Sequence, residues 1–423
     1  MSTAGKYIIR RYDRDGRTLD DIEDYKTLQI IDIANNTGMW KLTSISKNKC
    51  PFSPGEVIEV FRNGVSIYNG IFLSYAEEKQ FKYNSWKWEA SGVNTNQYMK
   101  WRLVAPETGD TYPSINWLLT RDFTMSGNVE DIIGTLVNNN MVYGTPHYNR
   151  GPLTPGFYLC RGARAQAPFI TSQESIISRY DVVYDVISEL LYKNNLFILP
   201  VNTHDPSMAF DFGIEYLITS GNDLSNNVIF TTENNEIETF RHFVESPDVT
   251  HVVASYNSED SAFGSPDYMW RFAVAKPIPG FNWQIDTGGR ETFYKPKLED
   301  FDGHLSRDKL IELCEKKASA YKINSEYYEV ELNLIASPYT YGYDYNSQAS
   351  EFTTDYRLGD KIGIDVDGET FTGRLTGMEF YSAYGKEYIK PTLGEFQKRT
   401  FDKITSNLTE LNKTTSKNEN TGV

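Results

Sequence analysis

Apolar and polar residues along most of the chain either alternate or gather in short apolar runs, which is the pattern of β-strands with one or both faces buried. Turn-forming pairs such as Asp-Gly and Asn-Asn separate these runs. Strands are therefore predicted at residues 7–9, 28–33, 39–45, 81–90, 196–201, 228–232, 249–256 and 327–334. The run at 81–90 alternates aromatic with polar side chains, which predicts a strand with one aromatic face.

Three segments instead repeat their apolar residues at helical spacing. The first covers residues 126–137 and carries acidic side chains in its first turn, where they are favoured. The second is predicted to follow a capping box, Thr-Ser-Gln-Glu at residues 171–174, and to end at residues 194–195. The third covers residues 306–321. We expect the first two to belong to an insertion between β elements.

Two hairpin patterns about three hundred residues apart are nearly the same, one at residues 54–71 and the other at residues 358–374. Each begins with a glycine and an acidic residue and continues through alternating apolar residues. In each, nine positions separate the first glycine from the glycine of the turn, Gly55 to Gly64 and Gly359 to Gly368. This internal repeat predicts two related small β-domains, one near each end of the chain.

The turn of each hairpin is predicted to be type I′, because Asn63-Gly64 and Asp367-Gly368 tolerate positive φ at both central positions. A further glycine follows each turn, Gly70 in the first copy and Gly373 in the second, and its offset differs by one residue. A strand glycine indicates a bulge or a close backbone approach. A chain that carries its β-domain twice is often a building block of a ring.

The charge balance excludes several classes of partner. The chain has 423 residues, room for two to four domains, and a formal net charge of −15. A protein that grips nucleic-acid phosphates or anionic lipid concentrates Lys and Arg on one face, so neither role is expected. Three widely spaced cysteines show no metal or disulfide spacing, which favours a reducing cytoplasm. The sequence shows no signal peptide and no apolar run of spanning length.

Short motifs that could carry chemistry are better explained as turns. Asp286-Thr287-Gly288 is the triplet of aspartic proteases, but it occurs once, and a dyad would need a symmetric dimer. Residues 13–16 and 365–368 resemble the start of calcium loops, yet lack the remaining oxygen ligands. The five histidines show no metal-binding spacing, and there is no Gly-x-Ser-x-Gly elbow. We therefore expect no enzyme, no cofactor and no metal site.

Residues 338–345, Pro-Tyr-Thr-Tyr-Gly-Tyr-Asp-Tyr, form the most aromatic stretch of the chain. Exposed tyrosines bind sugars or proteins well, because they offer area at low entropic cost. The alternative is a β-domain loop whose tyrosines, including Tyr341 and Tyr343, pack locally. An interface role lies between these two interpretations.

The order of these segments resembles the tail hub, or baseplate hub, proteins of long-tailed phages, and most closely the siphophage hub-like tail proteins of phages of Gram-positive bacteria. Four segments carry the resemblance, and together they span residues 28–389: residues 54–70, the predicted helix at 179–187, residues 222–230 with the run at 236–256, and residues 358–362. None is a sharp motif alone; their order and spacing carry the resemblance.

The resemblance implies a β-rich α+β fold, with two similar small β-barrel domains and an inserted α/β region. It implies a homotrimer whose six barrels form a pseudo-sixfold ring between the distal tail or tail tube protein and a tail-tip spike or fibre protein. Such a protein would be part of the virion, assembled in the host cytoplasm, and genome DNA would pass through its bore without specific binding. Because the sequence ends soon after the expected second barrel, we expect no fused hydrolase or long fibre extension.

The expected domains are a first β-barrel at residues 1–104, completed by 225–260, an inserted domain at 105–224, a linking region at 261–325, a second barrel at 326–398 and a polar tail at 399–423. Ten residues are candidates for the interface: Gly55, Asn63, Gly64, Gly70, Gly359, Asp367, Gly368, Gly373, Tyr341 and Tyr343. A carbohydrate- or receptor-binding tail module using the tyrosines at 339–345 is a second hypothesis. A cell-wall hydrolase is a third.

Overall fold

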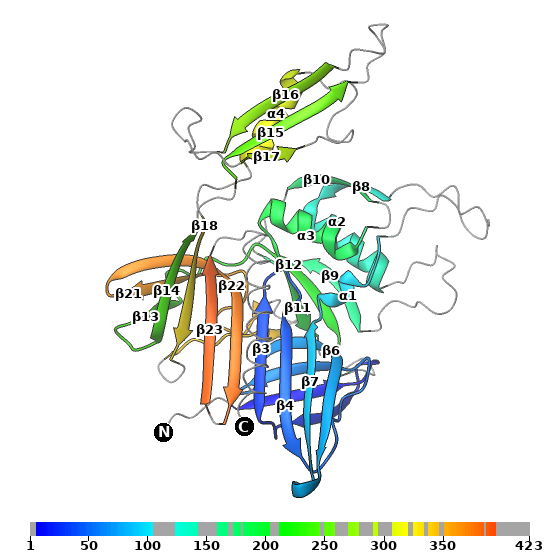
Figure 1. The fold of residues 1–423 in the computed structure, drawn as a ribbon, viewed down its shortest axis with the longest axis vertical. Coiled ribbons are helices and arrows are strands. Elements are labelled where there is room, and N and C mark those ends of the chain that lie inside the picture. Colours follow the sequence, from blue (N-terminus) through cyan, green and yellow to red (C-terminus); the bar gives the residue numbers. More distant parts are fainter. Residues whose placement is uncertain are drawn as a thin grey trace, which may run out of the picture. The chain divides into compact units, whose positions relative to one another are not determined.

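The computed structural model describes residues 6–104, 123–142, 159–167, 172–178, 181–203, 211–245, 249–258, 270–278, 291–294, 307–319, 325–333, 337–346, 351–384 and 386–394 (Figure 1). The chain divides into two compact units. Unit 1 consists of Met1–Arg241 with Tyr328–Val423, and unit 2 of His242–Tyr327. The finer five-part division expected from the sequence stays a prediction, and the polar tail lies outside the described residues.

The N-terminal half of unit 1 is a run of antiparallel strands in the spatial order β3-β4-β7-β6-β5-β1-β2. Its strands are β1 (Tyr7–Tyr12), β2 (Thr18–Ile22), β3 (Thr27–Ile33), β4 (Met39–Ser46), β5 (Val57–Arg62), β6 (Val65–Gln80) and β7 (Ser85–Asn94). Alternate residues of β4 are buried, among them Trp40 and Leu42, as the period of two predicts. The strands predicted at 7–9, 28–33 and 39–45 are thus confirmed.

The C-terminal half of unit 1 has the spatial order β14-β18-β23-β22, with β21 on β22 and β13 on β21. Its strands are β13 (Ile229–Thr231), β14 (Ile237–Glu245), β18 (Ser325–Leu332), β21 (Lys361–Val366), β22 (Glu369–Ala383) and β23 (Lys386–Gly394). The short pair β19 (Tyr345–Asn346) and β20 (Glu351–Phe352) lies between β18 and β21 in the chain.

The two halves join where β22 pairs with β3, so that they form one 13-stranded sheet (Figure 1). The path of this sheet is open at β2 and at β14. Among the strands that the structure describes, no pairing closes either half into a barrel. The mostly β fold is confirmed, whereas the two-barrel arrangement stays a prediction.

A helix-containing insertion follows β7 and the short helix α1 (Gln97–Lys100). It contains β8 (Phe123–Asn128), α2 (Val129–Val137), the π-helix η3 (Asn138–Val142), β9 (Cys160–Ala165), β10 (Gln173–Ser178), α3 (Val183–Asn194), β11 (Phe197–Asn202) and β12 (Ile214–Thr219). The apolar stripes of α2 and α3 share one core with Tyr12, Val57 and Ile71 of the N-terminal half. The insertion is therefore packed on that half rather than tethered to it.

Two predicted elements differ from the structure. Residues 173–178, expected to open a helix after a capping box, form β10 instead, because they pair with β8 along six residues. The helix α3 begins only at Val183, and its first residue is not capped by a side chain. Residues 81–83 form the 3-10 helix η1, and the aromatic strand starts at Ser85. Its aromatic face is confirmed, since Trp86 and Trp88 both pack on the central core.

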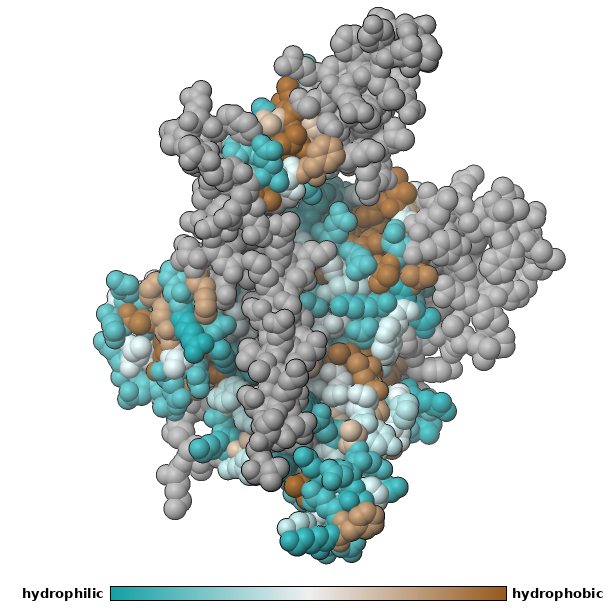
Figure 2. Space-filling model, viewed as in Figure 1, coloured by the Kyte–Doolittle hydropathy of each residue, from teal (hydrophilic) through white to brown (hydrophobic). Residues whose placement is uncertain are grey.

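The central core of unit 1 draws residues from both β halves. It includes Ile30, Trp40 and Ile58 from the N-terminal half and Ile364 and Phe380 from the C-terminal half, all at most 1% exposed. Figure 2 shows hydrophilic residues over much of the visible described surface, with apolar residues confined to small areas. This shared core makes the two halves one folding unit.

Unit 2 packs one helix on a three-stranded sheet. The strands are β15 (His251–Ser258), β16 (Trp270–Pro277) and β17 (Glu291–Tyr294), in the order β16-β15-β17, and the helix is α4 (Arg307–Ser319). Leu310, Cys314 and Ala318 form its apolar stripe and are buried against Val252 and Ala254. The predicted third helix is confirmed. In the described parts of the chain, no helix is long and apolar enough to cross a membrane.

Candidate functional site

The two repeated hairpins have the same turn. In the first, Asn63 and Gly64 have φ values of 53° and 87°; in the second, Asp367 and Gly368 have values of 54° and 88°. Arg62 pairs with Val65, and Val366 pairs with Glu369, so each loop has two residues. Positive φ at both loop positions defines the predicted type I′ turn, which is confirmed in both copies.

The strand glycines occupy equivalent places despite their different offsets from the turn. Gly70 pairs with Ile58, and Gly373 pairs with Ile362, which lie three residues after Gly55 and Gly359 respectively. The register of the first hairpin shifts between Val60 and Phe61, whereas the second hairpin has no shift. One bulged residue in β6 therefore explains the one-residue difference read from the sequence.

The equivalence continues past the glycines. The β6–β7 register skips Leu73, and the β22–β23 register skips Thr376. Each bulged residue lies three positions after its glycine, Gly70 or Gly373. Because bulges interrupt a ladder at a defined place, the same bulge in both copies aligns β6 with β22 residue by residue from Gly70 and Gly373 onward.

The strand order repeats as well. In the N-terminal half the order β1-β5-β6-β7-β4-β3 reads across the sheet, and in the C-terminal half the order is β13-β21-β22-β23-β18-β14. Matching these strands one by one also preserves their order along the chain. One pairing differs in direction, since β1 is antiparallel to β5 while β13 is parallel to β21. The repeat read from two hairpins thus extends to six strands in each half.

A cross-strand ion pair recurs at the same place with its charges exchanged. Lys41 Nζ on β4 lies 3.1 Å from Glu89 Oε2 on β7, and Lys390 Nζ on β23 lies 3.0 Å from Glu329 Oε2 on β18. Glu89 pairs with Ala76, and Lys390 pairs with Glu379, each six residues after its strand glycine. Glu89 and Lys390 are therefore equivalent, and we take their ion-pair partners Lys41 and Glu329 to correspond.

The candidate glycines differ in their surroundings. A Cβ atom on Gly64 or Gly368 would meet nothing within 4 Å, because both lie at open hairpin tips. On Gly70 it would lie 2.6 Å from Trp40 Cδ1, and on Gly359, whose φ is 90°, it would lie 2.8 Å from the Phe197 ring. On Gly55, whose φ is 91°, the nearest atom is Arg14 Cβ at 3.7 Å. The turn glycines are thus accessible, whereas Gly70 is required by the core.

Tyr341 and Tyr343 lie inside the molecule, each 4% exposed. Their hydroxyls donate to Oδ2 of Asp32 on β3, at 3.3 Å and 2.8 Å, and Asn94 Nδ2 donates to Oδ1 of the same carboxyl group at 3.1 Å. Burial raises the pKa of Asp32 to about 6, and the hydrogen bonds oppose this rise. These two tyrosines pack locally and offer no exposed face to a sugar.

The Asp32 cluster lies at the junction of the two halves. Seven residues of β3, Thr27–Ile33, pair with seven residues of β22, from Ala383 to Gly377. Asp32 itself pairs with Met378. The side chain of Gln29 donates to Glu379 Oε1 across the same junction, at 3.0 Å. The tyrosines of the 338–345 stretch thus close the core where the halves meet.

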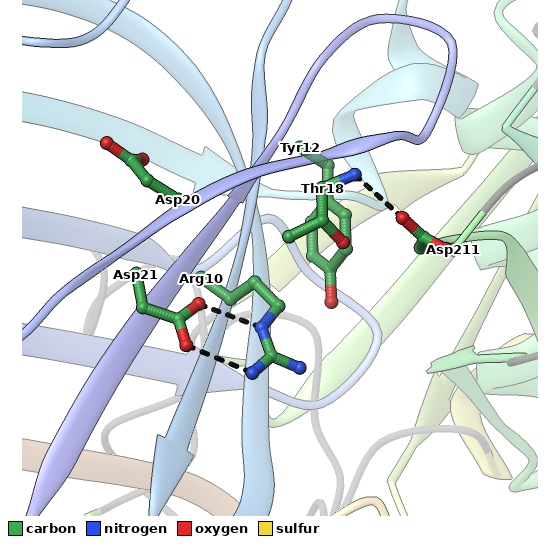
Figure 3. A pocket seen from close by; sticks show the side chains of 6 residues that line it. All are labelled: Arg10, Tyr12, Thr18, Asp20, Asp21 and Asp211. Atoms are coloured by element: carbon green, nitrogen blue, oxygen red, sulfur yellow. Dashed lines mark hydrogen bonds and ion pairs between the residues drawn. The ribbon is translucent and has the colours of Figure 1, made fainter.

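An open hollow of about 610 Å³ lies over β1 and β2, lined by Arg10, Tyr12, Thr18, Asp20, Asp21 and Asp211 (Figure 3). Its charged groups are already paired. Arg10 donates to both carboxylate oxygens of Asp21, at 2.8 Å and 3.0 Å, which lowers the pKa of Asp21. The backbone amide of Thr18 donates to Asp211 Oδ2 at 3.0 Å. This arrangement stabilises the β1–β2 hairpin and presents no group prepared for catalysis.

The cysteines and metal-ligating side chains that the structure describes form no reactive cluster. Cys160 and Cys314 are buried, and burial raises the pKa of the Cys160 thiol to about 12, which favours the unreactive neutral form. No group of three metal-ligating side chains is present in the described residues. The Asp286-Thr287-Gly288 triplet lies outside the described residues.

Two buried polar groups escaped the sequence analysis. The sequence pattern assigned no role to Asp32 and did not predict the buried ion pair of Arg11 with Glu56, whose atoms lie 2.9 Å apart. The residue pattern marks such positions only as interruptions of a run. Their partners come from strands distant in the chain, so no local signal identifies them.

Comparisons with known proteins found a matching family model and solved structures with a similar fold. The family model described as Siphovirus ReqiPepy6 Gp37-like protein matches residues 8–263. The fold is similar to the tail protein from Neisseria meningitidis MC58, with a TM-score of 0.53 at 12% identity, covering 92% of this chain and 96% of that chain. It is also similar to the prophage MuSo2 43 kDa tail protein from Shewanella oneidensis, with a TM-score of 0.52 at 10% identity, covering 92% and 98%. No curated protein sequence matches.

Proposed function

The chain belongs to the Siphovirus ReqiPepy6 Gp37-like family, and from this we propose that it is a structural protein of a phage tail, the hub at the tail tip. Three copies would form a ring that joins the tail tube or distal tail protein to a spike or fibre protein. The predicted relationship to siphophage proteins is confirmed at the level of the family. The fold shared with the two tail proteins supports the proposed role.

The observation that carries the proposal is the repeat of six strands in the same order in both halves of unit 1. A trimer of such chains presents six similar β units, which is what a protein needs to mate with a sixfold ring on one face and a threefold tip on the other. Closed rings of this kind arise from a head-to-tail interface that repeats around an axis. Neither a binding module nor a hydrolase needs two equivalent halves.

The charge of the chain supports a passive conduit for DNA. With a net charge of −15, the protein as a whole repels phosphate, so a genome could slide past its wall without being held. In a gel-shift assay at low salt, we expect the purified chain to leave double-stranded DNA unretarded. Retardation at micromolar protein would contradict the conduit.

The mass of the native particle tests the hub itself. Light scattering across a range of concentrations should show a species near three times 48.4 kDa, either for the chain alone or once its tail-tube neighbour is added. Negative-stain images of that species should show a ring with six similar lobes. A chain that stays monomeric alone and with its tail neighbours contradicts the hub.

A further inference from the structure

The junction of the two halves uses one particular edge of β22. Along this edge, residues 369–374 pair with β21, and residues 377–383 continue beyond β21 and pair with β3. The opposite edge of β22 pairs with β23. The protein thus contains one complete example of how a C-terminal half binds an N-terminal half.

The equivalent junction, which would join β6 to β14, is not formed within the described chain. On β6, the equivalent of β22, residues 65–71 pair with β5, and residues 74–80 of the same edge pair with no strand that the structure describes. β14, the equivalent of β3, ends the described sheet and pairs with β18 on one side only. Both open edges are the counterparts of edges that are paired inside the chain.

Residues of β6 beside the open edge are exposed, whereas the equivalent residues of β22 are buried. Leu73 and Tyr75 are 50% and 48% exposed, whereas their counterparts Thr376 and Met378 are 3% and 1% exposed. The backbone carbonyl of Thr376 accepts a hydrogen bond from Ala34, the residue that follows β3. Apolar side chains on a long open strand edge lead to pairing with another chain unless they are covered.

We propose that residues 74–80 of β6 pair antiparallel with β14 of a second copy of this chain, in the way that β22 pairs with β3. This inference rests on the proposed ring and names the edges that close it. The second copy is the fitting occupant because β14 is the one described strand that corresponds to β3 and has an open edge. Repeated head to tail, the contact continues the sheet from chain to chain.

The repeat also predicts a register. With Glu329 taken as the counterpart of Lys41, Gln29 pairs with Lys41, and Arg241 Nη1 lies 3.7 Å from Glu329 Oε2. Arg241 on β14 therefore has the position of Gln29 on β3. Thr239 bonds to Glu331 at 3.3 Å as Thr27 bonds to Thr43, which gives the same alignment.

This alignment places opposite charges face to face between chains. Gln29 pairs with Tyr381, and Tyr381 and Glu78 both lie eight residues after their strand glycines. Arg241 of one copy therefore lies opposite Glu78 of the next, and Thr239 lies opposite Gln80. Both Glu78 and Arg241 are exposed in the single chain. Cross-strand pairs of opposite charge favour a register, and like charges there oppose it.

Charge exchange in the full-length chain tests the pair. Glu78→Arg and Arg241→Glu alone should each raise the concentration of half-dissociation of the assembly by about tenfold or more, because each variant places like charges together at every junction. The double variant should return to within about threefold of the unmodified chain. Glu369→Arg, an exposed charge reversal on the hairpin arm of β22, is the matched control and should have no effect. The readout is analytical ultracentrifugation at low salt.

Disulfide trapping tests the register directly. Gln80→Cys with Thr239→Cys should give covalently closed trimers on non-reducing gels, whereas Gln80→Cys with Glu238→Cys, which is one residue out of the predicted register, should not. An assembly that forms without this cross-link, and that tolerates each charge reversal, overturns the inference and leaves the proposed hub standing. A chain that neither assembles nor cross-links at any concentration, alone or with its tail-tube neighbour, contradicts both.

Discussion

The N-terminal and C-terminal halves of unit 1 have the same strand order, the same hairpin turn and the same bulge, but they differ in what covers their edges. β3 of the N-terminal half is paired with β22, whereas β14 of the C-terminal half ends the sheet. The core also differs, since Gly70 is packed against Trp40 while Gly373 faces Leu393. The comparison shows that backbone geometry was kept in both halves while the contacts around it diverged.

The largest expected difference between the halves concerns the two strand glycines. Gly70→Ala should lower the free energy of unfolding by about 3 kcal/mol, because the new Cβ would lie 2.6 Å from Trp40 and 2.8 Å from Tyr68. Gly373→Ala should cost less than about 1 kcal/mol, since its nearest contact is Leu393 Cβ at 3.1 Å. Urea unfolding followed by tryptophan fluorescence measures both. Equal losses would show that the two environments are alike.

The Asp32 cluster should make stability depend on pH. The pKa of Asp32 is about 6 in the folded chain against about 3.9 for a free aspartate, so the folded state holds the proton more tightly between pH 4 and 6. Stability should therefore fall as pH rises through this window, by roughly 2 to 3 kcal/mol, and then stay constant with respect to this group.

Asp32→Asn should remove this pH dependence, whatever its own cost in stability, because the amide does not titrate. Tyr343→Phe keeps the carboxyl group and removes its shorter tyrosine hydrogen bond, which is 2.8 Å long. It should enlarge the fall and extend it to higher pH, since this hydrogen bond lowers the pKa of Asp32. Thermal unfolding measured at half-unit pH steps provides the test. An unchanged slope in Asp32→Asn would assign the titration to another group.

The hairpin turns should respond in nearly the same way. Asn63→Ala and Asp367→Ala place alanine at φ values of 53° and 54°, which costs about 1 kcal/mol each. Asn63→Ala should be the more harmful, because Asn63 Oδ1 accepts a 2.9 Å hydrogen bond from the backbone amide of Lys6, whereas Asp367 Oδ1 accepts a longer one, 3.4 Å, from the Thr232 hydroxyl. Asn63→Gly keeps the turn and loses that bond alone. Loss of the turn in one copy only would show that the hairpins are not equivalent.

The smallest effect belongs to the exchanged ion pairs. Lys41→Glu or Glu89→Lys alone should cost about 0.5 kcal/mol, and the two together should restore stability, because the double variant reproduces the arrangement of the other half. High salt should reduce the difference. A double variant that is less stable than either single one would show that each half requires its own placement of the positive and the negative side chain.

The sequence predicted what is local in the fold. The hairpins were found because turn chemistry and the two-residue alternation of apolar side chains lie within about fifteen residues. The helix α4 was found because its stripe, from Leu310 to Ala318, is regular. Residues 173–178 were misread as helical because β8, which makes them a strand, comes from 45 residues earlier at its nearest pair, Gln173 with Asn128.

What the sequence did not predict depends on distant partners. The β3–β22 junction joins residues far apart in the chain, as the 350 positions between Gln29 and Glu379 show. Neither a turn motif nor the spacing of apolar residues predicts such a pairing. Tyr341 and Tyr343 were left between a surface role and local packing, and only the position of Asp32 decides between these. The repeated hairpins were recognisable from the sequence, and their role as an interface stays a prediction, while the open edges beside them needed the sheet order.

The seven-residue pairing of β3 with β22 also has a mechanical meaning. Backbone hydrogen bonds in an antiparallel pair run perpendicular to the strands. A load directed along the strands is therefore shared by all the bonds of the junction at once. A load that peels the strands apart meets the bonds one at a time. The two halves of unit 1 should therefore resist sliding along this seam far better than opening across it.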